Sequence, residues 1–170
     1  YAVVVGYDRA KEQVVLHSGT TERLVLPMGT FENTWARSSH WAMRATRPDQ
    51  LPVTARPDDW AVAVAALERS NPQAARTAYA TGLSRWPQHR ISLLGLGNTA
   101  YALGQREEAA QAFEATTRAH PDFADAWNNL AQVRLELGQL PAARQAARQA
   151  VALGGARLAN YQTLLQGIER

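Results

Sequence analysis

An internal repeat with a period of 34 residues constrains the fold of this chain more than any other feature. Pro87 and Pro121 are separated by this period. The same spacing separates Tyr79 and Phe113, Ala75 and Ala109, Ala109 and Ala143, Gly104 and Gly138, Gln105 and Gln139, and Leu96 and Leu130. So many matches at one period predict a stack of similar units in the C-terminal two thirds of the chain.

The residue types at the repeated positions favour pairs of antiparallel helices. Small residues such as Gly97, Ala109 and Ala143 allow two helices to approach closely. Large rings are expected to occupy the space between one pair and the next, and they are supplied by Tyr79, Phe113 and Trp127. Gly104 and Gly138 are expected to end first helices, and Pro57, Pro72 and Pro141 to begin helices.

The period and the residue types resemble the tetratricopeptide repeat (TPR). The middle copy carries the motif residues Leu96, Gly97, Ala109, Phe113 and Pro121. This resemblance implies three copies, at about 56–89, 90–123 and 124–157, and a capping helix at 158–169. The outer copies depart from the motif, with Val62-Ala63 in place of Leu-Gly and Gly155 in place of Pro, as terminal copies commonly do.

The first 46 residues have a different pattern. Short β-branched runs predict four antiparallel strands, at Ala2 to Tyr7, Glu12 to His17, Arg23 to Met28 and His40 to Thr46. A short helix is expected between the last two, with Thr30 as its N-cap. Proline-rich residues 47–56 predict a linker before the repeats at 57–170. The predicted fold class is α+β, a small antiparallel sheet with one short helix followed by an all-α repeat.

The segments YAVVVGYD, VVLHSG and FENTWARSSHWAM resemble the C-terminal part of papain-like peptidases that remove double-glycine leader peptides from bacteriocins. In this bacterial family a catalytic His directly precedes the first of these strands, and an Asp ends the next. The resemblance therefore implies that the catalytic Cys and His would lie before Tyr1. Ser18 stands at the position of the Asp, and a hydroxyl cannot stabilise an imidazolium as a carboxylate does.

Composition and spacing exclude several kinds of site. The sequence contains no cysteine, so a thiol nucleophile and thiolate metal ligands are absent from these residues. The four histidines, His17, His40, His89 and His120, are scattered, so we expect no metal site, catalytic residue or cofactor. The formal charge of +3 is not gathered into a basic run, which argues against nucleic acid. No apolar run is long enough to span a bilayer.

The remaining candidate site is the groove that first helices form in a TPR array. The resemblance places eight residues on it: Trp60, Val64, Leu94, Asn98, Tyr101, Asn128, Gln132 and Leu135. Asparagine amides both donate and accept hydrogen bonds, which suits a peptide backbone. Trp60 and Tyr101 have a second interpretation, as core residues. The family's clamp for a C-terminal carboxylate is not expected, because its lysine positions hold Leu94 and Asp125.

One further polar cluster allows two interpretations. Arg144 and Arg148 lie one helical turn apart, with Arg134 and Arg157 expected nearby. They form either a cationic patch for an acidic partner or a solvated helix face.

Three functions agree with these observations. The first is a non-catalytic scaffold that binds a peptide or protein in the groove. The second is the C-terminal piece of a leader peptidase, and the third is self-association through the repeats. Because four strands and one short helix cannot hide all their apolar residues, the sheet at Tyr1 to Tyr7 is also expected to be covered by a second copy or a separate N-terminal fragment.

Overall fold

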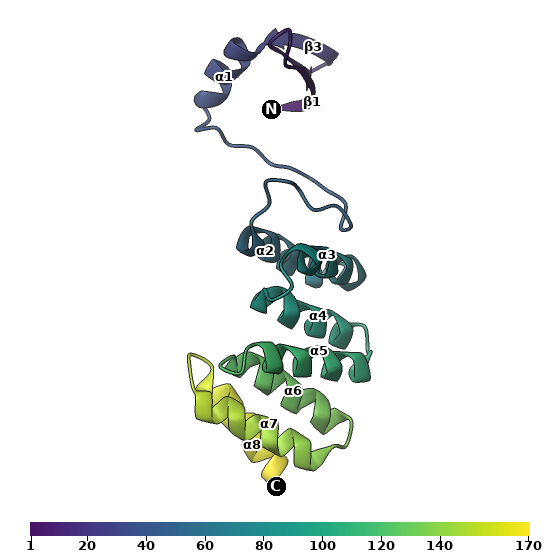
Figure 1. Ribbon diagram of the computed structural model, residues 1–170, viewed down its shortest axis with the longest axis vertical. Helices are drawn as coiled ribbons and strands as arrows, with labels where there is room; N and C mark the ends of the chain where they lie inside the picture. The colour runs from purple at the N-terminus through teal and green to yellow at the C-terminus, as the bar shows by residue number, and fades with distance from the viewer. The chain divides into compact units, whose positions relative to one another are not determined.

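The computed structural model describes residues 1–170, which form two units. Unit 1 comprises Tyr1–Ala45 and unit 2 comprises Thr46–Arg170. The α+β class predicted from the sequence is confirmed, because a small antiparallel sheet precedes an all-helical repeat (Figure 1). No helix has both the length and the apolar character needed to cross a membrane.

Unit 1 consists of a three-stranded antiparallel sheet and one helix. The strands are β1 (Ala2–Asp8), β2 (Gln13–Ser18) and β3 (Thr21–Pro27), in the order β1-β2-β3, and they are followed by α1 (Met28–Ala36). Alternate residues of the central strand, Val14 and Leu16, are buried. A bulge between Val4 and Gly6 shifts the register of β1 against β2.

Two sequence-based expectations for unit 1 are wrong. The predicted fourth strand, His40 to Thr46, is not a strand. Ser39 and His40 have φ of 54° and 55°, so the chain turns after α1, and the indole of Trp35 donates to the carbonyl of Trp41. Thr30 is not the N-cap either, because α1 begins directly after Pro27.

β1 is an edge strand with an exposed surface. Val3 is 63% exposed and Tyr7 is 68% exposed, and both lie on a strand that pairs only with β2. An apolar pocket of about 530 Å³ lies within unit 1, lined by Val4, Tyr7, Val14, Met28, Gly29, Phe31 and Glu32. The expectation that another chain or fragment covers Tyr1 to Tyr7 stays a prediction. Sedimentation of the chain as a monomer with no bound fragment would contradict it.

Unit 2 is a stack of helices that follow one another in chain order (Figure 1). The helices are α2 (Pro57–Glu68), α3 (Pro72–Arg85), α4 (Arg90–Ala102), α5 (Arg106–Ala119), α6 (Ala124–Glu136), α7 (Leu140–Leu153) and α8 (Leu158–Glu169). Pro57, Pro72 and Pro141 lie at helix starts, and Gly104 and Gly138 follow first helices with φ of 78° and 72°. These predicted roles are confirmed, since positive φ favours glycine.

Glycines of α4 allow the close packing that the repeat pattern predicts. A Cβ added at Gly95 would overlap the ring of Tyr79, and one added at Gly97 would overlap the ring of Phe113. Both rings are almost completely buried. α4 is therefore packed between α3, which carries Tyr79, and α5, which carries Phe113.

The first helical pair is one residue shorter than the other two. α4 and α6 begin at Arg90 and Ala124, and their partners begin at Arg106 and Leu140. α2 begins at Pro57 and its partner begins at Pro72, so the step between the two starts is shorter by one residue. A residue of α2 and its structural equivalent in α4 are therefore separated by one residue less than the 34-residue period. The same one-residue difference applies between α2 and α6.

Polar bonds between successive pairs recur along the edge of unit 2 where the first helices begin. His89 Nε2 lies 3.0 Å from Asp58 Oδ1, and His120 Nε2 lies 2.8 Å from the carbonyl oxygen of Gln88. The hydroxyl of Tyr161 in α8 donates to Asp125 Oδ1 in α6 at 2.6 Å. Each bond joins residues about one repeat apart, so these contacts stabilise the stacking of neighbouring pairs.

Substituting Gly97 tests the packing of α4. We expect Gly97→Ala to lower the free energy of unfolding by about 1–3 kcal/mol, because the new methyl group overlaps the buried ring of Phe113. Urea unfolding followed by circular dichroism measures the change. The matched control is Gly167→Ala in α8, where a Cβ meets no atom within 4 Å. This control should be stabilised by about 0.5–1 kcal/mol, and equal effects of the two variants would contradict the packing.

The bond between Tyr161 and Asp125 predicts a pH dependence of stability. Burial, followed by the hydrogen bond to Asp125, raises the pKa of Tyr161 to about 12, compared with about 10 in an unfolded chain. A raised folded pKa stabilises the fold below pH 10, and this stabilisation is lost as the pH rises toward 12. Tyr161→Phe should cost about 1 kcal/mol at pH 8 and less at pH 11, by urea unfolding. A cost that stays constant with pH, or one matched by the exposed Tyr7→Phe, would contradict this assignment.

Candidate functional site

Six of the eight predicted groove residues lie on neighbouring first helices of unit 2. We define the first-helix face by these six partly exposed residues, three on α4 and three on α6: Leu94, Asn98, Tyr101, Asn128, Gln132 and Leu135. Leu94, Tyr101 and Leu135 pack at the margin of the main hydrophobic core. The face therefore combines amides with half-buried apolar side chains.

The structure does not place Trp60 and Val64 on this face. Trp60 is 8% exposed and Val64 is 4% exposed, and both belong to the core of the first pair. The Trp60 indole donates to the carbonyl of Ala78 at 2.9 Å. The cause is the shorter first pair: Trp60 is the fourth residue of its helix, as Trp127 is of α6, whereas Leu94 is the fifth residue of α4.

The amides of the first-helix face keep hydrogen-bonding atoms free. Asn129 Nδ2 donates to Asn98 Oδ1 at 3.1 Å, which leaves the Asn98 amide group free to donate. Gln132 Nε2 donates to Glu136 Oε1 at 2.9 Å, which leaves the Gln132 carbonyl free to accept. Asn128 makes no side-chain hydrogen bond within the protein, so it offers both a donor and an acceptor.

Tyr101 is less available for contact with a ligand than the sequence suggests. The Arg106 guanidinium lies 4.0 Å from the centre of its ring, and its hydroxyl donates to Glu136. The hydrogen bond to Glu136 raises the pKa of Tyr101, and bonds from Gln132 and Tyr101 lower the pKa of Glu136. Arg106 also forms an ion pair with Glu136. These charges compensate each other, so the face as a whole is close to neutral.

Sequence reasoning missed three residues beside this face, namely Arg106, Asn129 and Glu136. Asn129 directly follows Asn128, so only the helical geometry distinguishes its bond to Asn98 from a solvent contact. Arg106 and Glu136 belong to different repeats and meet through long side chains. The one available signal was that Glu136 lies one turn after Gln132 on the same helix.

The first-helix face offers hydrogen bonds and apolar contacts to a ligand. Outside this face, one chain of hydrogen-bonded polar side chains resembles a catalytic triad. His89 Nδ1 lies 2.9 Å from Ser92 Oγ, and His89 Nε2 lies 3.0 Å from Asp58 Oδ1. Ser92 is completely buried, so a substrate carbonyl cannot reach its hydroxyl. No group of three or more His, Cys, Asp or Glu residues is arranged to hold a metal ion.

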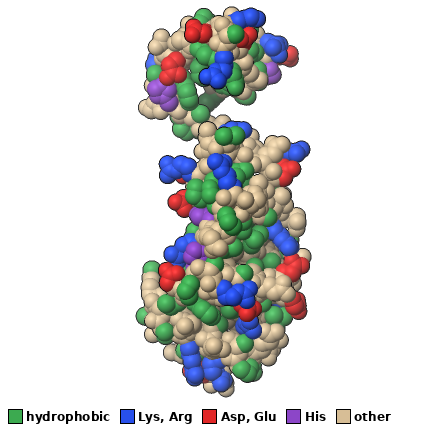
Figure 2. Space-filling model, viewed as in Figure 1, with side chains coloured by type: hydrophobic (Ala, Val, Ile, Leu, Met, Phe, Trp, Pro, Cys, Tyr) green, Lys and Arg blue, Asp and Glu red, His purple; other side chains and the backbone are tan.

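The side chains on the visible surface of unit 2 include interspersed acidic and basic groups (Figure 2). Many of these charges are paired. Arg134, which the sequence places near Arg144, pairs with Glu114, and Arg157 pairs with Asp125. Neither of these two arginines lines the pocket that contains Arg144 and Arg148. Arg134 and Arg157 therefore pair with other residues, and of the four arginines only Arg144 and Arg148 line this pocket.

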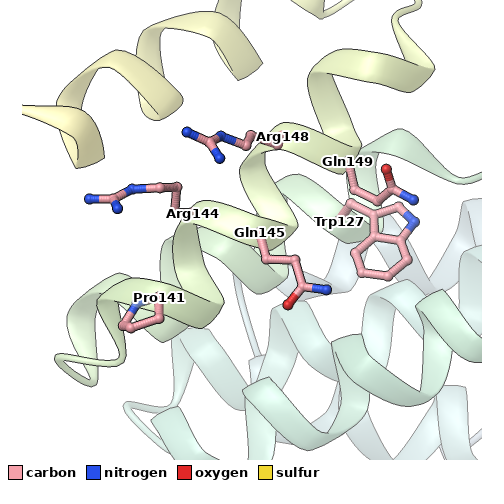
Figure 3. Close-up of a pocket in the computed structure, with 6 residues that line it drawn as sticks. All are labelled: Trp127, Pro141, Arg144, Gln145, Arg148 and Gln149. Atoms are coloured by element: carbon pink, nitrogen blue, oxygen red, sulfur yellow. The ribbon is translucent and has the colours of Figure 1, made fainter.

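Trp127 also differs from its predicted role. It was expected to fill the space between helical pairs, but it is only half-buried. Its indole donates to the carbonyl of Pro121 at 2.9 Å, and it lines a surface pocket of about 450 Å³ with residues of α7 (Figure 3).

Comparison with solved structures shows the fold of unit 2 in known proteins. The Yersinia enterocolitica type III secretion chaperone SycD in complex with a peptide of the translocator YopD is 16% identical, with a TM-score of 0.61, over 66% of this chain and 91% of that chain. The complex of the TPR2B domain of yeast Sti1 with pHsp70 is 14% identical, with a TM-score of 0.62, over 66% and 95%. The Sgt2 TPR domain from Aspergillus fumigatus is 23% identical, with a TM-score of 0.62, over 74% and 83%.

No curated protein matches the chain. The tetratricopeptide repeat family model matches residues 62–105 and 94–157, which together make up more than half of the sequence. This match does not extend to unit 1, whose resemblance to leader peptidases stays a prediction. On the basis of the family match and the helical pairs of unit 2, this chain belongs to the tetratricopeptide repeat family.

Proposed function

We propose that the chain is a non-catalytic scaffold that binds an extended peptide of a partner protein on its first-helix face. The observation that carries this proposal is the set of free amide atoms on Asn98, Asn128 and Gln132, next to half-buried leucines. These amides suit the main chain of a peptide, and Leu94 and Leu135 suit an apolar side chain. The complexes of SycD with a peptide of YopD and of the Sti1 TPR2B domain with pHsp70 support this use of the fold.

The electrostatics of the face favour an uncharged peptide segment. The nearest charges, Arg106 and Glu136, are paired with each other. Leu94 and Asp125 replace the lysines that a carboxylate clamp would need, and Asp125 is itself bonded to Tyr161. We therefore expect recognition of an internal peptide segment through its main chain, with little dependence on ionic strength.

Substitution of the amides tests this function. A probe is first selected by displaying random dodecapeptides against the full chain, then labelled with fluorescein and measured by anisotropy. Asn98→Ala and Asn128→Ala should each weaken its binding about three- to tenfold, because each removes one or two hydrogen bonds to the peptide. Asn128→Ala leaves no partner unsatisfied within the protein.

The matched control is Gln111→Ala, which removes an exposed amide on α5, away from the first-helix face. Its binding should equal that of the unchanged chain. Failure to select any peptide, or equal affinities for Asn98→Ala, Asn128→Ala and Gln111→Ala, would contradict the proposed function.

A further inference from the structure

A second surface of unit 2 contains a pocket, and it lies on α7. We define the α7 pocket as the cavity of about 450 Å³ lined by Trp127, Pro141, Arg144, Gln145, Arg148 and Gln149. In Figure 3 the side chains of Arg144 and Arg148 point to one side of α7, Gln149 and Trp127 lie on the other side, and Gln145 projects between them. None of these residues belongs to the first-helix face.

The pocket is open because Trp127 cannot lie where its counterpart lies. Trp60, the fourth residue of α2, packs on Gly82, the eleventh residue of α3. A Cβ at Gly82 would lie 2.7 Å from the Trp60 Nε1 atom. The eleventh residue of α7 is Ala150, so an indole placed on α7 as Trp60 is placed on α3 would overlap the methyl group of Ala150. Trp127 is therefore half-buried, and its ring is available to a ligand.

Another repeat holds an arginine at the position equivalent to Arg144, and that arginine binds a carboxylate. Arg144 is the fifth residue of α7, and Arg76 is the fifth residue of α3. The guanidinium of Arg76 donates to Glu108 Oε2 and Gln105 Oε1, both at 2.6 Å, in the next repeat. Arg144 is exposed and forms none of the ion pairs of the chain, so its guanidinium lacks the carboxylate that Arg76 has.

The second arginine of the pocket is partly neutralised. Arg148 donates to Glu169 Oε1 at 2.8 Å, and the two side chains are 64% and 40% exposed. The lining residues and Glu169 together carry one uncompensated positive charge, which belongs to Arg144. The pocket therefore complements a single carboxylate more than it complements a polyanion.

We propose that the α7 pocket binds a short acidic peptide segment of a partner protein. The carboxylate of a Glu or Asp side chain pairs with Arg144, in the manner of Glu108 with Arg76. Gln145 and Gln149 bond to the peptide main chain, and an apolar side chain next to the carboxylate lies against the ring of Trp127. This site goes beyond the proposed function, because its residues and its ligand chemistry both differ from those of the first-helix face.

The test uses the full chain, labelled with nitrogen-15, and two capped peptides as probes. Acetyl-Gly-Glu-Leu-Glu-Gly-amide should shift the indole resonance of Trp127 and the side-chain amide resonances of Gln145 and Gln149. The isosteric peptide with Gln in place of both Glu residues should bind about tenfold more weakly, because it lacks the charge-assisted bond. Equal binding of the two peptides, or shifts located elsewhere, would overturn the proposal.

Substitutions of Arg144 and of Glu169 should change the affinity for the acidic peptide in opposite directions. Arg144→Gln should weaken binding of the acidic peptide about tenfold. Glu169→Gln should strengthen it about two- to threefold, because it releases Arg148 for the ligand. The matched control is Arg69→Gln, an exposed arginine at the end of α2, which should have no effect.

Two further outcomes would overturn the proposal. One is equal binding by Arg144→Gln and the unchanged chain. The other is displacement of the acidic peptide by a single-stranded oligonucleotide of equal charge at lower concentration, which would assign the pocket to nucleic acid. Asn128→Ala should leave the acidic peptide bound, so a failure of this site and a failure of the first-helix face are distinguishable.

Discussion

The fold of unit 2 depends on the fit of two aromatic rings against two glycines of one helix. Gly95 and Gly97 lie on α4, and they receive the rings of Tyr79 from α3 and Phe113 from α5. Burying each ring contributes about 1.5–3 kcal/mol, and either ring would be displaced by a single methyl group. Because α4 is held on both sides, the remaining side of this helix carries the partly exposed amide and leucine side chains that form its half of the first-helix face.

A one-residue difference in length decides which side chains become available for binding. The residues of α2 are shifted by one place relative to α4 and α6, so Trp60 lies in the core although it is 34 residues before the partly exposed Leu94. The residue of α6 equivalent to Trp60 is Trp127, which is only half-buried, and Ala150 stands where the first pair has Gly82. The same residue type at equivalent positions thus stabilises the core in one repeat and lines a pocket in another.

These details explain how far the sequence predicts the structure. The helices of unit 2 follow from the period, because glycines, prolines and rings recur where backbone geometry and close packing require them. The absence of a fourth strand was not apparent from the sequence, because the turn after α1 places Ser39 and His40 at positive φ with no glycine to mark it. The ion pair between Arg106 and Glu136 was not apparent from the sequence either, since long side chains from different repeats meet only in the folded chain.

The two candidate surfaces illustrate a division between buried and exposed positions within the repeat. Buried positions such as Ala75, Ala109 and Ala143 keep the same small residue in each pair, because any added volume would separate the helices. The position that follows is less constrained, so the fifth residue of the second helix is the partly exposed Arg76 in one pair, the buried Ala110 in the next and the exposed Arg144 in the last. Arg76 stabilises the stack through Glu108, whereas Arg144 has no such partner within the chain. The candidate binding residues therefore lie where the repeat pattern is least regular.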